Sequence, residues 1–180
     1  MKAEDDKTRI LNDHCLMAYS GEAGDTGMLT RSFGRGKVQF AEFIQANVQL
    51  YGMRSNCTQA LSPSSVSSFV RTELAKSLRS RKPYNLNLLI GGYDTVNDKP
   101  ELYWLDFLAA KDKLPYAAHG YAQYYCLSIL DKHHHPNIDL EQGLKILRMC
   151  IEELDRRMPM NFKGVNVKVI TKTGIQDLEY

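Results

Sequence analysis

The chain has 180 residues, the usual size of one folded domain, and 43% of them are hydrophobic, which is typical of a globular protein. Its 23 basic and 21 acidic residues leave a formal net charge of +2, so charge gives no indication of binding to nucleic acid or an anionic membrane. No apolar run approaches the roughly 20 residues of a membrane span, and the charged start predicts no signal peptide. Four widely spaced cysteines indicate buried thiols in a reduced intracellular protein: Cys15, Cys57, Cys126 and Cys150.

The first part of the chain predicts two short strands and two connecting segments. Lys7 to Leu11 is short and mixed, and Cys15 to Ser20 is an apolar run of the length of a buried strand. Gly21 to Thr26 allows a tight turn from a strand into a helix, because glycine accepts unusual backbone angles. Gly27 to Lys37 has neither a helix nor a strand period, so we expect a loop there.

Two helices are predicted next. Val38 to Arg54 places apolar side chains at spacings of four, four and three, on one helix face: Phe40, Ile44, Val48 and Tyr51. Ser62 and Pro63 predict the start of a second helix, as N-cap and first helical residue. Its apolar stripe consists of Val66, Phe69, Val70, Leu74 and Leu78. Its end carries four basic residues, Lys76, Arg79, Arg81 and Lys82. They fit a solvated cap that suits the helix dipole, with an anion site as the alternative, and Pro83 ends the helix.

The middle of the chain predicts a strand meander. Asn85 to Asp94 and Leu102 to Leu108 are apolar at successive positions, so we expect both faces of these strands to be covered. Thr95 to Pro100 is a turn-rich connector, which suits a hairpin of antiparallel strands. Lys113 to Ala118 is the third strand candidate.

The last third predicts two helices and two strands. Gly120 to His134 reads as a third helix, and Asp139 opens a fourth with Gln142 completing a capping box. The stripe of the fourth helix consists of Leu144, Leu147, Ile151, Leu154 and Met158. Val165 to Ile170 alternates as a half-exposed strand, and Ile175 to Leu178 begins the returning strand.

This order of elements indicates an α+β fold. Two consecutive helices do not form a single crossover between adjacent parallel strands, so helix pairs between antiparallel strand groups suggest helices on the outer faces of sheets. Strands that are apolar on both faces imply a sheet pressed between a helix layer and another sheet. We therefore expect a single domain over residues 1–180 that forms a four-layer α-β-β-α sandwich.

Six segments of the chain carry a family resemblance. In order, they are GEAGDT at Gly21 to Thr26, VQFAEFIQANVQLY at Val38 to Tyr51, LSPSSVSSFVRTELAKSLRSRKPY at Leu61 to Tyr84, LIGGYD at Leu89 to Asp94, LPYAAHGY at Leu114 to Tyr121 and RMPMNFKGVNVKV at Arg157 to Val169. Together they resemble the β-type subunits of the proteasome, in particular a non-catalytic fungal member. They cover nearly the whole chain except Gly27 to Lys37, and their order is more specific than any single motif.

The resemblance implies the N-terminal nucleophile hydrolase fold and a place in a large protease. Such subunits form seven-membered rings, two of which stack between rings of α-type subunits to make the 20S core particle. The resemblance thus implies other β-type and α-type subunits as partners, ubiquitin-dependent protein degradation as the process, and the cytoplasm and nucleus as the location. A free-standing amidohydrolase or peptidase of the same fold is the alternative, although it would need an N-terminal Cys, Ser or Thr.

The family's catalytic positions can be compared with this sequence. Active members attack the peptide with an N-terminal Thr whose own amino group serves as base, and a nearby lysine keeps the site electropositive. Lys7 falls where the lysine stands, His119 replaces the Ser of a Ser-Gly turn, and Pro159 or a neighbour replaces a supporting Asp. The first threonine, Thr8, follows the lysine instead of preceding it. We therefore expect no catalytic residue, and the resemblance implies no cofactor.

A metal site is a separate hypothesis, raised by the run from His133 to His135. Neighbours on a helix point about a hundred degrees apart, so three adjacent histidines cannot all face one ion. We expect no metal ligand.

Two departures from the family pattern remain. The match begins at about Glu4, so the family's first two strands are expected to be missing, which would leave strand edges unpaired. Gly27 to Lys37 interrupts a continuous family stretch. We interpret this insertion as a retained intron or gene-model artefact, and the alternative is a genuine surface loop, which would cost only about 1–2 kcal/mol in closure entropy.

Overall fold

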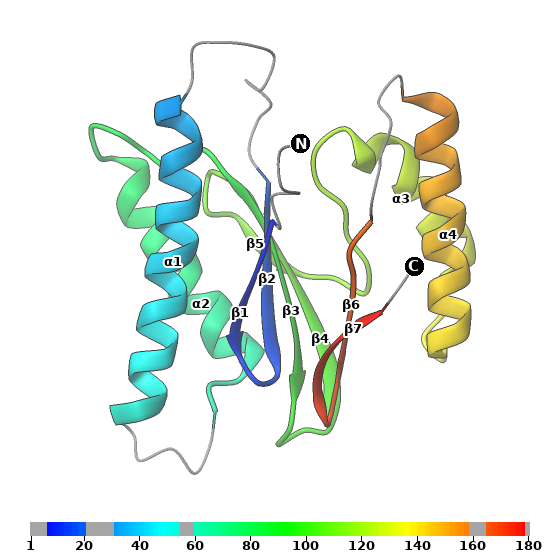
Figure 1. Ribbon diagram of the computed structural model, residues 1–180, viewed down its shortest axis with the longest axis horizontal. Coiled ribbons are helices and arrows are strands. Elements are labelled where there is room, and N and C mark those ends of the chain that lie inside the picture. The colour runs from blue at the N-terminus through cyan, green and yellow to red at the C-terminus, as the bar shows by residue number, and fades with distance from the viewer. Residues whose placement is uncertain (1–6, 21–30, 55–59, 159–164, 179–180) are drawn as a thin grey trace.

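Five strands form an antiparallel sheet in the order β1–β2–β3–β4–β5 in a computed structural model that describes residues 7–20, 31–54, 60–158 and 165–178, without the side chains of 31–37 (Figure 1). The strands are β1 Thr8–Asn12, β2 Cys15–Ser20, β3 Asn87–Asp94, β4 Lys99–Leu105 and β5 Lys111–Lys113. The first four confirm predicted strands. β2 pairs with β3 although two helices separate them in sequence, so the helix pair is an insertion between neighbouring strands.

Helices α1 (Arg31–Arg54) and α2 (Pro63–Leu78) cover one face of this sheet (Figure 1). Most predicted stripe positions on both helices are buried: Phe40, Ile44, Val48, Val66, Val70 and Leu74. They pack against buried residues of β2, β3 and β4, which form the main hydrophobic core. Phe69 is half-buried, and Leu78 in the last turn of α2 was wrongly included, because it is exposed. Tyr51 was wrongly included in the stripe: it is 55% exposed, because the last turn of α1 extends beyond the β1–β2 hairpin.

The expected loop at Gly27 to Lys37 is wrong for most of its length. The backbone from Arg31 to Lys37 is helical and continues into the predicted helix, whereas residues 27–30 lie outside the described residues. Extending an existing helix adds one hydrogen bond for each residue fixed, whereas starting one fixes several residues for a single bond. The well-packed part of α1 after Lys37 therefore extends into a preceding sequence of weak helix propensity, although this sequence contains Gly34 and Gly36.

The β3–β4 hairpin is confirmed, but the strand after it ends earlier than predicted. Asp106 accepts backbone hydrogen bonds at Oδ1 from Leu108 at 3.0 Å and Ala110 at 2.8 Å, and this turn reverses the chain directly after Leu105. Leu108 is consequently exposed rather than part of a strand. The third predicted strand is also misplaced, because β5 stops at Lys113 and Pro115, which has no N–H, cannot continue the ladder.

The second face of the sheet is covered by the part of the chain that follows β5. β6 (Val167–Thr171) and β7 (Gly174–Leu178) form a two-stranded sheet, and β6 contacts β3. Helices α3 (Ala122–His133) and α4 (Leu140–Arg157) pack on each other beyond this hairpin (Figure 1). From left to right, Figure 1 thus shows α1 and α2, the large sheet, the small sheet, and α3 with α4.

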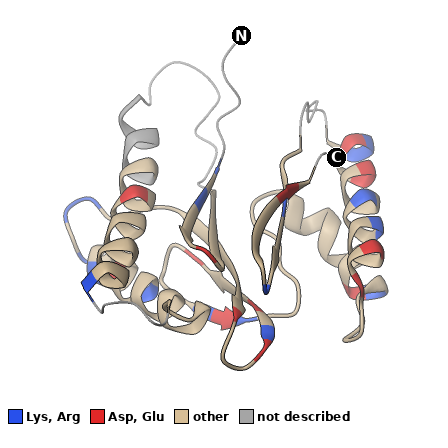
Figure 2. Cartoon of the chain, turned by 60° about the horizontal axis from the view of Figure 1, so that its bottom comes forward, with Lys and Arg blue, Asp and Glu red and all other residues tan. Residues whose placement is uncertain are grey.

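The start of α4 confirms a sequence prediction, whereas its buried face corrects one. Asp139 and Gln142 form the predicted capping box. The most buried side chains of α4 are Ile146 and Cys150, which pack against Cys126 of α3. The predicted stripe is only half-buried, because α3 covers the neighbouring face of the helix. Helix α4 carries both acidic and basic residues along its length (Figure 2).

None of the described helices combines the length and hydropathy that a membrane-crossing helix needs.

Candidate functional site

Lys7 and His119 lie at the same end of the five-stranded sheet. The carbonyl of Lys7 accepts a hydrogen bond from the Tyr19 N–H at 2.9 Å, and Tyr19 pairs with Leu88 of β3. His119 Nε2 lies 3.0 Å from the Leu88 carbonyl oxygen. The four residues therefore form one row across three neighbouring strands, and strand spacing separates the Lys7 and Leu88 backbones by about 10 Å. Lys7 is exposed, and Pro159 lies outside the described residues.

His119 is held in place by contacts that occupy its ring. The ring stacks on Trp104 of β4, with centroids 5.0 Å apart and planes 17° from parallel. Because a carbonyl oxygen can only accept, the Nε2 atom beside Leu88 must donate. Burial lowers the pKa of His119, opposed by backbone hydrogen bonds to Leu88 and Leu105. The imidazole is therefore neutral near pH 7 and ties the loop before α3 to the sheet.

Other contacts at this end of the sheet hold the backbone and the imidazole in place. The Arg9 guanidinium donates to the Thr8 carbonyl oxygen at 2.8 Å, and the His119 ring is engaged by Leu88 and Trp104. That the chain has no catalytic residue stays a prediction.

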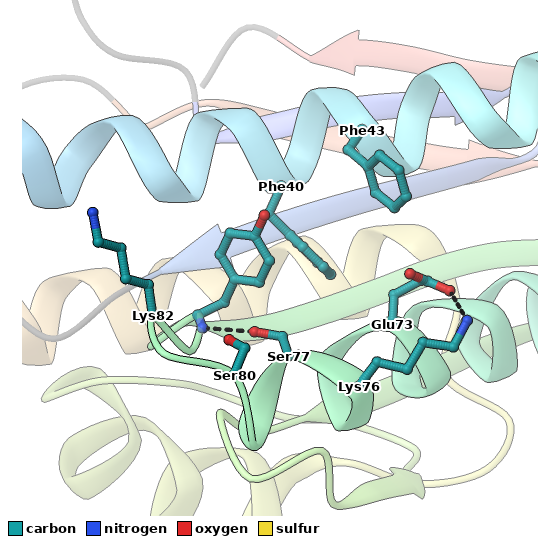
Figure 3. A pocket seen from close by; sticks show the side chains of 8 residues that line it. Phe40, Phe43, Glu73, Lys76, Ser77, Ser80 and Lys82 are labelled. Atoms are coloured by element: carbon teal, nitrogen blue, oxygen red, sulfur yellow. Dashed lines mark hydrogen bonds and ion pairs between the residues drawn. The ribbon is translucent and has the colours of Figure 1, made fainter.

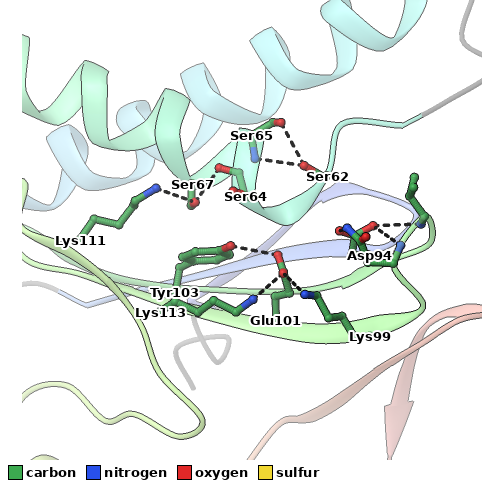
Figure 4. Close-up of polar contacts among 12 residues, drawn as sticks. Ser62, Ser64, Ser65, Ser67, Asp94, Lys99, Glu101, Tyr103, Lys111 and Lys113 are labelled. Atoms are coloured by element: carbon green, nitrogen blue, oxygen red, sulfur yellow. Dashed lines mark hydrogen bonds and ion pairs between the residues drawn. The ribbon is translucent and has the colours of Figure 1, made fainter.

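A second group of polar side chains lies between the start of α2 and strands β4 and β5 (Figure 4). Glu101 is only 8% exposed, yet its Oε1 lies 2.5 Å from Lys113 Nζ and its Oε2 accepts a hydrogen bond from Tyr103 at 2.9 Å. Lys99 Nζ is 3.9 Å from the same carboxylate. The hydrogen bond to Glu101 is the main cause that raises the pKa of Lys113. The two lysines and the Tyr103 hydroxyl compensate the buried charge of Glu101. Through Lys113, the carboxylate links β4 to β5.

The start of α2 is bound to the same strands by hydroxyl groups. Ser62 Oγ caps the helix by accepting from the Ser65 N–H at 3.2 Å, as predicted. Lys111 Nζ lies 3.0 Å from Ser68 Oγ and 3.4 Å from Ser67 Oγ. The Ser67 hydroxyl donates to the Ser64 carbonyl oxygen at 2.8 Å. These contacts attach the start of α2 to β5.

A pocket opens between α1 and α2 on the outer side of the helix layer (Figure 3). It has a volume of about 340 Å³ and is lined by Phe40, Phe43, Glu73, Lys76, Ser77, Ser80, Lys82 and Tyr84. We call it the α1–α2 pocket. Sequence reasoning found only its basic residues, because the pocket requires α1 and the end of α2 to lie side by side.

The histidine run does not form a metal site in the described structure. His133 ends α3, and His134 is its C-cap and packs its ring on Tyr116 at a centroid distance of 5.0 Å. No group of three or more His, Cys, Asp or Glu side chains suited to a metal ion occurs among the described residues.

Comparisons with known proteins agree on one family. A model of the family described as "Proteasome subunit" matches residues 1–170. The probable proteasome subunit beta type-4 of Neurospora crassa is 63% identical over 180 residues, which cover 100% of this chain and 82% of that protein. The proteasome subunit beta type-4 of Saccharomyces cerevisiae is 54% identical over 99% of this chain and 84% of its own. The proteasome subunit beta type-2 of Dictyostelium discoideum is 36% identical over 100% of this chain and 84% of that protein.

Proposed function

The chain belongs to the proteasome subunit family, and we propose that it serves as a structural, non-catalytic β-type subunit of the 20S core particle. The observation that carries the proposal is the 54–63% identity to fungal beta type-4 subunits across the length of the chain. Its contribution to ubiquitin-dependent protein degradation is then made through assembly, with other β-type and α-type subunits in stacked rings as partners.

The absence of catalysis is a separate part of the proposal. It is supported by His119, whose ring is engaged by Leu88 and Trp104 at a position where the family resemblance implies a serine. Thr8 also supports it. The nitrogen of Thr8, the first residue of β1, is joined to Lys7 in a peptide bond, so it is not the free amino group that a threonine nucleophile uses as base. A free-standing amidohydrolase of the same fold is not favoured by any contact among the described residues.

The fold proposal is the four-layer α-β-β-α sandwich of N-terminal nucleophile hydrolases. Its support is the order of helices and sheets across the molecule (Figure 1). We further propose a location in the cytoplasm and nucleus, which follows from the proposed assembly and is tested by imaging a fluorescently tagged chain.

Affinity purification tests the assembly. A tagged chain expressed in fungal cells should be recovered in core particles together with α-type and β-type subunits, in amounts comparable to those subunits. A matched tag on an unrelated cytoplasmic protein controls for carry-over. Recovery of the chain only as free or aggregated protein would contradict the proposed function.

Peptide cleavage tests the catalytic part. The purified chain should not cleave fluorogenic peptides, and core particles carrying Lys7→Ala or Thr8→Ala in this chain should keep their full peptidase activity. Turnover by the chain alone that a threonine-directed inhibitor stops, and that Thr8→Ala abolishes, would refute it.

A further inference from the structure

The α1–α2 pocket combines an aromatic floor with an open mouth (Figure 3). Phe40 is buried beneath it and packs on Tyr84, with ring centroids 4.8 Å apart. Phe43 lines the pocket with 45% of its surface exposed, and Leu50, two turns later on the same helix face, is 44% exposed. These two exposed apolar side chains lie on the pocket side of α1, separated by Asn47, whose Nδ2 donates to the Phe43 carbonyl oxygen at 2.7 Å.

The rim of the pocket is basic. Lys82 lines the pocket, and Arg79 and Arg81 precede it in the exposed turn that appears as a blue loop at the left of Figure 2. Within the described ranges, none of these three cations has a salt bridge, whereas Lys76 is paired with Glu73 at 2.8 Å. Among the described residues, Lys82 and the two arginines that precede it in the turn thus carry a charge of about +3 without a salt-bridge partner, next to the aromatic side chains of the pocket.

Stabilisation of the α2 helix dipole does not explain why Lys82 lies at the pocket. The dipole effect is confined to the last turn of a helix, and α2 ends at Leu78, so Lys82 lies beyond its range. The turn is fixed in place instead: Ser77 Oγ accepts the Tyr84 N–H at 3.0 Å, and the Ser77 carbonyl accepts the Ser80 N–H at 2.9 Å. The chain therefore holds its basic turn at the pocket by specific hydrogen bonds.

We propose that the α1–α2 pocket is the docking site for a short acidic segment of a neighbouring subunit, which inserts one aromatic or large aliphatic side chain between Phe43 and Tyr84. This inference rests on the proposed function for the source of the segment. Charge complementarity selects an acidic partner, and the aromatic floor selects a peptide over a bare anion. The volume of about 340 Å³ lies at the lower limit of roughly 300–1,000 Å³ for ligand pockets, which suits one side chain rather than a large ligand.

Peptide binding to the purified full chain tests the recognition directly. The probe is a fluorescein-labelled octapeptide of alternating glutamate and phenylalanine, measured by fluorescence anisotropy. Lys82→Glu should weaken its binding about fivefold, as should Phe43→Ala, and added salt should weaken it further. The matched controls are Lys145→Glu and Leu140→Ala, exposed positions on α4 that should change nothing. Equal binding of a peptide with lysine in place of glutamate, or equal losses in the α4 variants, would overturn the proposal.

Crosslinking in cells separates this inference from the proposed function. A photo-crosslinking amino acid at position 43 should capture, in purified core particles, a subunit peptide with at least two acidic residues next to an apolar one. The same group at position 140 should capture a different peptide or none. A chain that is absent from core particles would refute the proposed function. A chain present in core particles whose position 43 captures no peptide, or a basic one, would refute the docking site alone.

Discussion

Gly92 of β3 lies directly against Pro63 in the first turn of α2, and an alanine there should disrupt the packing of α2 on the large sheet. A Cβ atom at residue 92 would lie 2.4 Å from Cγ of Pro63 and 2.9 Å from both Pro63 Cβ and the His14 carbonyl oxygen. Real Cβ contacts essentially never fall below 3.0 Å. The proline ring cannot rotate away, and the His14 carbonyl is held by a 2.9 Å hydrogen bond from Tyr93.

The expected loss of stability follows from these contacts. Overpacking a core by one methyl group costs about 1–3 kcal/mol, and here the first turn of α2 must also move from its buried position, so Gly92→Ala should cost about 3 kcal/mol. Gly143 of α4 provides the matched control, because nothing lies within 4 Å of its Cβ position. Gly143→Ala should stabilise the protein by up to about 1 kcal/mol through helix propensity.

Urea unfolding of the purified chain measures this difference, with Trp104 as the single fluorescent tryptophan. For an m-value of about 2 kcal/mol/M, Gly92→Ala should lower the midpoint by about 1.5 M, and Gly143→Ala should raise it by up to about 0.5 M. Gly91→Ala should fall between them, since the close contact of its Cβ position among the described residues is with the flexible end of Ile170 at 3.3 Å. If Gly92→Ala and Gly143→Ala unfold at the same midpoint, the described approach of α2 to β3 is wrong.

Three further predictions concern buried polar and thiol groups. Glu101→Gln removes the charge that compensates its lysine partners and should lower the unfolding free energy by about 2 kcal/mol, whereas the exposed control Glu152→Gln should stay within about 0.5 kcal/mol. Burial lowers the pKa of His119 from its ordinary value of 6.5, so the unfolded chain binds the proton more readily than the folded chain. The stability of the wild type should therefore fall relative to that of His119→Gln as the pH drops below about 6.5. Parallel stability profiles of the two proteins against pH would contradict this assignment. Burial raises the pKa of Cys150 to about 12 and also raises that of Cys126, so iodoacetamide at pH 8 should label both only after unfolding, as followed by mass spectrometry.

Sequence reasoning succeeded where the determining interactions are local. Ser62 and Pro63 start α2 because the cap and the fixed proline angle act within one helical turn, and Asp139 with Gln142 starts α4 for the same reason. The β3–β4 hairpin was predicted from the polar connector between two apolar runs, and the antiparallel pairing runs from Leu88 to Asp94.

Its errors occurred where distant parts of the chain decide the outcome. Tyr51 fits the helix period but lies where the helix has no sheet beneath it. One error was local instead: the apolar pattern through Leu108 concealed a turn in which the Asp106 carboxylate accepts from the N–H groups of Leu108 and Ala110. Glu101 could have been noticed as a lone acid in an apolar strand, although its closest lysine partner, Lys113, is brought to it by the pairing of β4 with β5.

At the candidate site, too, individual residues could be named from the sequence, whereas their positions relative to one another could not. Lys7 and His119 were singled out by resemblance, and their common row across the sheet comes from pairings between strands far apart in sequence. The α1–α2 pocket could be predicted only in part, because its phenylalanines and its basic turn belong to different helices.

The described residues form two separate hydrophobic clusters, so the two parts of the molecule should not open together. The large cluster joins α1 and α2 to the main sheet, whereas Cys126, Ile146 and Cys150 form a small one between α3 and α4. A helix pair with its own small core can detach without breaking the large one, so it forms a cooperative unit of lower stability. Amide protons of α3 and α4 should then exchange with deuterium through partial opening, while those of β2 and β3 should exchange only when the whole molecule unfolds.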